Sequence, residues 1–182
     1  MATFEMSSNS FCHLILGGAR SGKSRFGEAQ AAERVDAHHV NVSYLATAKA
    51  YDDEMRSRIE QHQLDRPIDW NTVEVPLALG EAITKASRLS HVVLVDCLTL
   101  WMMNALDDER PLSQHVDKLL GAIEKCQTPI VLVSNEISMG VVPMGELSRQ
   151  FVDELGRLHQ RIAQVANKVT LMVAGIPHPI KS

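Results

Sequence analysis

The sequence has 182 residues, 45% of them hydrophobic, which is enough apolar material for one domain with a sizeable core. Its net charge of −4 and its few aromatic residues (four Phe, two Trp and two Tyr) argue against binding to nucleic acid. No apolar run approaches the length of a membrane span, and the first ten residues lack the basic and apolar segments of a secretion signal. We therefore expect a cytoplasmic protein with a flexible tail over residues 1–11 and a single domain over residues 12–182.

The first informative segment is Gly17–Ser24, which reads G-G-A-R-S-G-K-S and follows an apolar run over 13–16 that predicts a strand. It fits the phosphate-binding loop pattern G-x-x-x-x-G-K-[ST], in which backbone N–H groups surround a phosphate chain. Lys23 would reach the terminal phosphates, and Ser24 would offer its hydroxyl to Mg²⁺. A helix predicted over 22–35 would add its positive end. The alternative, a Gly-rich turn between a strand and a helix, is disfavoured by these flanks.

Two glycines of this loop, Gly17 and Gly22, are expected to take backbone angles that are closed to other residues. That freedom would let the chain turn tightly around a phosphate. The loop alone therefore predicts a protein that binds a nucleoside triphosphate.

The rest of the chain alternates short apolar runs with stretches of helical periodicity, which predicts an α/β fold with a mostly parallel sheet and helices on both faces. One helix should begin at 52 and end before Arg66, and further helices should cover the ranges 77–89, 98–106, 113–126 and 146–167. Ser113 is the expected cap of the helix over 113–126. Strands are expected at 40–45, 70–75, 92–96, 130–133 and 169–174. The C-terminal tail, 175–182, is too rich in proline to continue a regular element.

Asp96 ends the strand V-V-L-V-D and is the natural partner of the phosphate loop. A carboxylate in this position can hold the Mg²⁺ shell beside Ser24, although many parallel strands end in Asp merely as a helix cap. Glu136, at the end of the next apolar strand, is a competing candidate because ligands collect at the carboxyl ends of such strands.

His62 is the second candidate for chemistry. Met55, Ile59 and His62 follow one another at i, i+4 and i+7, so they share one face of the helix that begins at 52. A neutral imidazole near the phosphate loop could attack phosphorus and form a covalent intermediate. The alternative is a core histidine that hydrogen-bonds a neighbour.

These motifs together resemble a known family, the bifunctional adenosylcobinamide kinase / adenosylcobinamide-phosphate guanylyltransferase of cobalamin biosynthesis. The resemblance runs from about Cys12 to the C-terminus. Besides the phosphate loop, it rests on Y-L-A-T-A, D-D-E-M-x-x-R-I-x-x-H, R-P-x-x-W-x-T-V-E, V-D-C-L-T, S-N-E-x-x-M-G-V-V-P and a closing G-I-P.

The resemblance implies two reactions. A nucleoside triphosphate phosphorylates the hydroxyl of the aminopropanol arm of adenosylcobinamide, and GTP then transfers GMP to that phosphate through a guanylylated histidine, releasing pyrophosphate. The matching histidine is His62. No dedicated base for the kinase step can be identified from the sequence.

The resemblance also implies a RecA-type sheet, assembly as a homotrimer and a set of nucleotide contacts. With Mg²⁺ held by Ser24 and Asp96, the implied contacts are Gly17, Gly18, Ala19, Arg20, Ser21, Gly22, Lys23, Ser24, Ala46, Thr47, Ala48, Gln63, Leu64, Asp65, Arg66, Glu74 and Asp96.

Two rival functions share the phosphate loop. One is a simple small-molecule or nucleotide kinase in which His62 is structural. The other is a non-catalytic nucleotide-dependent binding module or a RecA-like nucleic-acid motor, against which the acidic charge argues.

Overall fold

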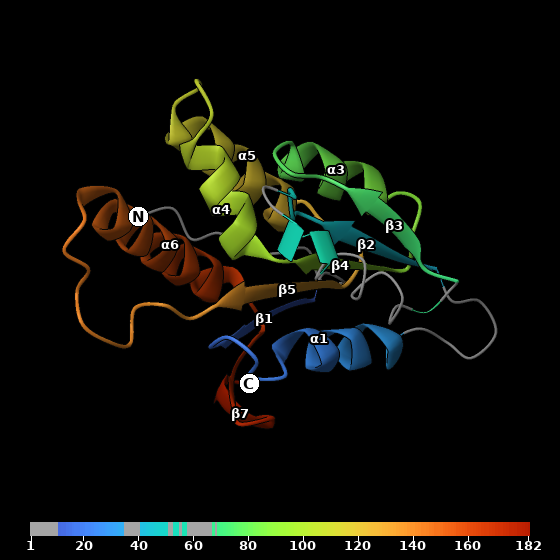
Figure 1. Cartoon of the computed structure of the whole chain (residues 1–182). Helices are drawn as coiled ribbons and strands as arrows, with labels where there is room; N and C mark the ends of the chain where they lie inside the picture. The colour runs from blue at the N-terminus through green and yellow to red at the C-terminus, as the bar shows by residue number, and fades with distance from the viewer. Residues whose placement is uncertain (1–10, 35–40, 51–52, 55, 58–66, 68) are drawn as a thin grey trace.

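The computed structural model describes residues 11–34, 41–50, 53–54, 56–57, 67 and 69–182. Within these residues seven strands form one sheet in the order β3-β2-β4-β5-β1-β6-β7 (Figure 1). The first six run parallel to their neighbours, and β7 is antiparallel to β6. The strands are β1 (Cys12–Gly17), β2 (Val42–Ala46), β3 (Asn71–Glu74), β4 (Val92–Asp96), β5 (Ile130–Asn135), β6 (Lys168–Val173) and β7 (Ile176–Lys181).

Helices cover both faces of the sheet, as expected from the sequence. Figure 1 shows α1 on one face, with α3, α4, α5 and α6 on the other. The helices are α1 (Lys23–Ala32), α3 (Leu79–Ala86), α4 (Leu98–Leu106), α5 (Leu112–Glu124) and α6 (Glu146–Val165). Residues 53–54 and 56–57 are also helical, in agreement with the helix expected to begin at 52, and the rest of that segment lies outside the described residues.

The sheet separates two hydrophobic cores because successive side chains of a strand point to opposite faces. Leu14 and Leu16 of β1 lie in the larger core, which includes Trp101 of α4. Ile15, between them, lies in the smaller core under α1 with Tyr44. Burial on both faces explains why the central strands read as uninterrupted apolar runs. None of the helices in the described part of the chain is long and apolar enough to cross a membrane.

The expected cap of α5 is wrong. The helix begins at Leu112, with Pro111 at the cap position and no side-chain cap. The Pro111 carbonyl accepts the N–H of Gln114 at 3.0 Å, which starts the first turn before Ser113. Proline suits a helix start because its fixed φ matches the helix and its missing N–H is not needed there.

The expectation that the C-terminal tail forms no regular element is also wrong, because β7 occupies Ile176–Lys181. Pro177 pairs with Met172 of β6, and Pro179 pairs with Thr170. The two prolines are two residues apart, so both place their missing N–H on the same side of the strand. An edge strand has one side without a partner, which is where proline is tolerated.

Candidate active site

The strand register brings most of the predicted site residues in the described chain to one edge of the sheet. Glu74 of β3, Ala46 of β2 and Asp96 of β4 are aligned across three neighbouring strands. Gly17, where β1 ends and the phosphate loop begins, is aligned with Asn135 of β5. This is the carboxyl edge of the parallel strands, where ligands bind in open α/β sheets.

The loop from Gly17 to Ser24 joins β1 to α1 through two left-handed residues. Gly22 has φ +88°, as expected for a glycine at this turn, and Arg20 has φ +58°. The Ser21 N–H donates to the Gly18 carbonyl at 3.3 Å and closes the turn. A positive φ is uncommon for a residue with a side chain, and the sequence pattern did not predict it at Arg20.

Gly17 is required for a different reason from the one expected. Its backbone is not left-handed, but a Cβ atom there would lie 2.5 Å from Ser21 Oγ and 2.9 Å from the Met172 carbonyl oxygen. The glycine therefore permits close packing of the loop against β6. Gly18 has open space around its Cα on the side where a Cβ would project.

The end of the loop is suited to an anion. Helix α1 begins at Lys23 with no side-chain cap and no acidic residue in its first turn, so its first N–H groups face outward without an anionic neighbour of their own turn. Lys23 Nζ donates to the Gly18 carbonyl at 3.3 Å, which folds the ammonium group over the loop. Ser21 Oγ is buried without a hydrogen-bond partner. Together these groups would suit the binding of a phosphate.

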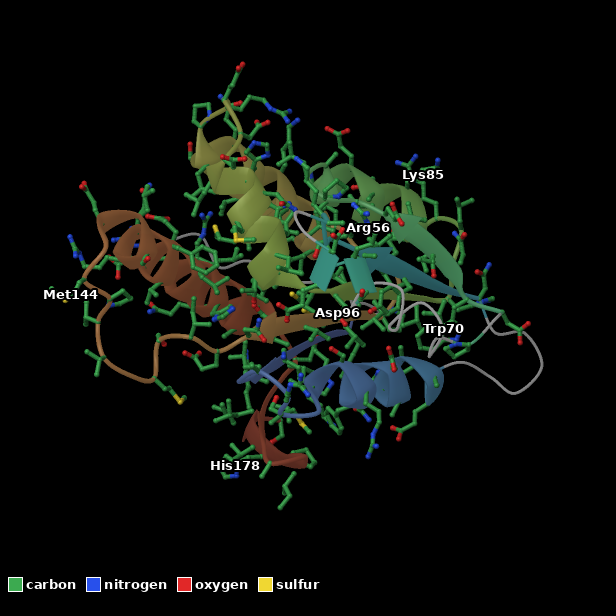
Figure 2. The ribbon with its side chains drawn as sticks, viewed as in Figure 1. Arg56, Trp70, Lys85, Asp96, Met144 and His178 are labelled. Carbon is green, nitrogen blue, oxygen red and sulfur yellow. The ribbon has the colours of Figure 1, made fainter. Side chains whose placement is uncertain are left out.

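Asp96 lies half-buried at the end of β4, near the middle of the molecule in Figure 2. The Tyr44 hydroxyl donates to its Oδ2 at 2.9 Å. The thiol of the next residue, Cys97, is affected by the charges around it. Burial, with a further contribution from Asp96, raises its pKa to about 11, and the charge of Lys23 lowers it. The lysine of the phosphate loop and the carboxylate of β4 thus act on the same group.

Ser24 and Asp96 fit Mg²⁺ better than a metal that needs a full set of protein ligands. In the described part of the chain no group of three or more His, Cys, Asp or Glu could hold a metal ion. Magnesium needs fewer, because it keeps several waters and is usually held by one or two carboxylates together with substrate phosphates. The Ser24 hydroxyl and the Asp96 carboxylate, both half-buried, would provide such a partial set.

Thr47 connects β2 to β4 and is fully buried. Its hydroxyl donates to the Cys97 carbonyl at 2.6 Å and accepts the Cys97 N–H at 2.8 Å, and its own carbonyl accepts from Asn104 at 3.0 Å. Its polar groups therefore hold the strand ends together. Ala48, which is half-buried, is the more accessible member of the expected contact segment 46–48.

Glu136 follows β5 and is joined to the start of the phosphate loop, because its N–H donates to the Gly17 carbonyl at 3.0 Å. Its Oε1 accepts the Ser138 N–H at 2.6 Å and also the Ser138 hydroxyl. Its Oε2 lies 3.9 Å from Nδ1 of His159, a buried residue of α6. Burial lowers the pKa of His159, although Glu136 acts in the opposite direction.

The contact between Glu136 and His159 was not predicted from the sequence. His159 stands four positions after Leu155 on the same stripe of α6, and that spacing was the available signal.

The proposed nucleophile, His62, and the predicted contacts Gln63, Leu64, Asp65 and Arg66 lie outside the described residues.

A groove with a volume of about 780 Å³ lies between α3 and α5. Its lining includes Lys85, Arg88 and Lys118, and it shares no residue with the carboxyl edge of the sheet. The groove is therefore separate from the candidate active site.

Solved structures with a similar fold are known. A KaiC-like protein from Pyrococcus horikoshii superposes with a TM-score of 0.54 at 14% identity, covering 88% of this chain and 70% of the other. The flagellar accessory protein FlaH from Methanocaldococcus jannaschii has a TM-score of 0.54 at 15% identity, covering 94% and 78%. With the loop at Gly17–Ser24, the fold defines a P-loop nucleotide-binding protein.

Relatives identify the particular family. The family model "Cobinamide kinase / cobinamide phosphate guanyltransferase" matches residues 13–180, and the chain belongs to this family. The bifunctional adenosylcobalamin biosynthesis protein CobP of Pseudomonas aeruginosa is 51% identical over 92% of this chain and 96% of its own length. The corresponding protein CobU of Escherichia coli is 39% identical over 92% and 98%. The chain is thus a cobinamide kinase and cobinamide phosphate guanyltransferase of cobalamin biosynthesis.

Proposed function

We propose that the protein phosphorylates adenosylcobinamide with a nucleoside triphosphate and then transfers GMP from GTP to adenosylcobinamide phosphate through a guanylylated His62. The products of the second reaction are adenosylcobinamide-GDP and pyrophosphate. The observation that carries the proposal is that the phosphate loop, which includes Lys23, lies at the same edge of the sheet as Asp96. This arrangement would suit a triphosphate, and the family description names cobinamide and cobinamide phosphate as the two acceptors.

The loop has the same task in both reactions. Its N–H groups, the start of α1 and Lys23 stabilise negative charge on the phosphates, which is the main requirement of phosphoryl and nucleotidyl transfer. In guanylyl transfer, the imidazole of His62 attacks the α-phosphorus, the bond to pyrophosphate breaks, and the loop holds the leaving group. The phosphate of adenosylcobinamide phosphate then attacks the same phosphorus and releases the histidine.

His62 must be unprotonated to attack. The ordinary pKa of histidine, about 6.5, leaves most of the imidazole neutral at cytosolic pH. Its role in the proposal rests on the D-D-E-M-x-x-R-I-x-x-H segment of the sequence.

Mg²⁺ is proposed as the metal of the site, held by the Ser24 hydroxyl and the Asp96 carboxylate with the nucleotide phosphates. Bound there, it would neutralise charge on the phosphates. Tyr44 supports this role because its hydrogen bond to Oδ2 orients the Asp96 carboxylate.

We also propose that the protein works in the cytoplasm as a homotrimer. The segment between β5 and α6 carries large apolar side chains with high exposure: Met139 (74%), Val141 (97%) and Met144 (97%). Leu147, in the first turn of α6, is 80% exposed. Figure 2 shows Met144 on a segment that projects away from the sheet. Exposed apolar groups of this size are typical of surfaces that a partner covers. Light scattering should give a mass three times that of one chain.

Labelling with GTP carrying a radioactive α-phosphate tests the covalent step. We expect an adduct that is labile in acid and stable in base, and that is lost in the His62→Ala variant. His91→Ala is the matched control, because His91 is exposed at the amino end of β4, at the opposite edge of the sheet. The absence of an adduct in the wild-type enzyme under turnover conditions would contradict the proposal and favour a simple kinase.

A further inference from the structure

The strand β5 lies between β1, which carries the phosphate loop, and β4, which carries Asp96. Glu136 therefore leaves the sheet beside the loop, and its N–H is bonded to the Gly17 carbonyl. Neighbouring strands are about 4.8 Å apart. Glu136 is one strand spacing from β1, whereas Glu74 on β3 is four spacings away, roughly 19 Å.

Hydrogen bonds hold the side chain of Glu136 in place, and no lysine or arginine among the described residues forms an ion pair with it. Ser138 donates both its N–H and its hydroxyl to Oε1. Burial lowers the pKa of His159, which lies 3.9 Å from Oε2, so its ring favours the uncharged form. The side chain of Glu136 is 12% exposed, and Oε2 is the oxygen that Ser138 does not bind.

Phosphorylation of an alcohol needs a group that accepts the hydroxyl proton as the oxygen attacks phosphorus. Among the described carboxylates of this edge, Asp96 is engaged by Tyr44 and proposed for the metal, and Glu74 is too distant. Glu136 is the carboxylate that remains beside the loop.

We infer that Glu136 is the general base of the kinase reaction, an inference that rests on the kinase half of the proposed function. The alcohol oxygen of the acceptor forms a bond to the γ-phosphorus, and the bond from that phosphorus to the β–γ bridging oxygen breaks. The electron pair leaves with the nucleoside diphosphate. The hydroxyl proton passes to a carboxylate oxygen of Glu136 and from there to water.

The two reactions can be followed separately in one enzyme preparation. With γ-labelled nucleotide, labelled cobinamide phosphate reports phosphoryl transfer, and with α-labelled GTP the protein adduct reports nucleotidyl transfer. The Glu136→Gln variant keeps the size of the side chain and an acceptor for Ser138 but removes the base. We expect its single-turnover phosphoryl transfer to fall about 10²–10⁴-fold, the range for loss of a general base. Adduct formation and nucleotide affinity should stay within about threefold of the wild type.

Ser138→Ala is the matched control, because it removes one hydrogen bond to Glu136 and leaves the carboxylate. It should reduce phosphoryl transfer far less than Glu136→Gln does. Kinase activity near the wild-type level in Glu136→Gln would overturn the inference. So would an equal loss of both reactions, which indicates a structural role, or a defect that saturating Mg²⁺ repairs, which assigns Glu136 to the metal. A failure of the proposed covalent step would instead appear as a missing adduct in the wild type.

Discussion

The hydroxyl of Tyr44 on β2 donates a hydrogen bond of 2.9 Å to Oδ2 of Asp96 on the neighbouring strand β4. Tyr44 is almost fully buried, and the centroid of its ring lies 6.3 Å from that of the Trp70 ring. The tyrosine therefore fixes one oxygen of the proposed metal-binding carboxylate from within the core. Partners of this kind, behind a metal ligand, commonly change metal affinity or activity by 10- to 100-fold.

Replacing Tyr44 with phenylalanine should weaken Mg²⁺ binding without removing the packing of the ring. We expect the Mg²⁺ concentration that gives half-maximal activity to rise at least several-fold, with activity recovered at saturating metal. Asp96→Asn is the stronger comparison, because it changes the carboxylate itself and should not be recovered. An unchanged Mg²⁺ requirement in Tyr44→Phe would show that the hydrogen bond only supports the fold.

Local sequence signals were sufficient for much of the fold. The strand over Val92–Asp96 and the helix over Leu98–Leu106 have the predicted bounds, because an uninterrupted apolar run and a helical run follow each other directly. The phosphate loop was equally readable, since its pattern is contiguous.

Contacts between segments far apart in the sequence could not be predicted. Tyr44 and Asp96 are 52 residues apart, and His159 reaches Ser134, 25 residues earlier, at 2.8 Å. Their pairing depends on strand order and on where α6 packs, which no local pattern contains. The edge strand β7 was missed for a related reason: proline is unfavourable in a strand unless the strand lies at an edge, and that position depends on the whole sheet.

Lys23 provides a test of where the triphosphate binds. Its ammonium group is folded over the loop, 3.3 Å from the Gly18 carbonyl, and would exchange this contact for phosphate oxygens. A hydrogen bond to a charged group contributes about 1.5–3 kcal/mol, so Lys23→Ala should weaken nucleotide binding by about 10- to 100-fold. Both phosphoryl and guanylyl transfer should fall.

Arg25→Ala is the control for Lys23, since it removes an exposed cation from the same turn of α1. Equilibrium binding of a labelled, non-hydrolysable triphosphate gives the affinity of each variant. Guanylylation of Lys23→Ala at the wild-type rate would mean that GTP does not occupy this loop.

Gly17 and Gly18 are adjacent, but alanine should affect them very differently. A Cβ at Gly17 would lie 2.5 Å from Ser21 Oγ and 2.9 Å from the Met172 carbonyl, while at Gly18 no heavy atom lies within 4 Å. Overpacking of this kind typically costs about 1–3 kcal/mol of unfolding free energy. Gly17→Ala should lower stability in urea unfolding by that amount, and Gly18→Ala should lie within about 0.5 kcal/mol of the wild type. Equal effects would contradict the close packing of the loop against β6.

The stability of the protein should depend on pH through His13. The side chain is buried in β1, with Nε2 2.8 Å from Thr170 Oγ1 and Nδ1 without a partner. Burial lowers its pKa from 6.5 to about 4, with smaller contributions from Lys168 and Arg34. Between these two values the unfolded chain binds a proton that the folded chain does not. The stabilising effect of neutral His13 is therefore complete above about pH 6.5 and is lost as the pH falls towards 4, by roughly 3 kcal/mol.

Urea unfolding at a series of pH values between 4.5 and 7.5 tests this dependence. His13→Gln removes the titrating group and keeps a side chain that can hydrogen-bond Thr170, so its unfolding free energy should fall less steeply with acid than that of the wild type. A residual slope is expected because burial also lowers the pKa of His159. His91→Ala, at an exposed position, should retain the wild-type slope. If His13→Gln and the wild type lost the same free energy over this range, the proton uptake on unfolding would have to come from other groups.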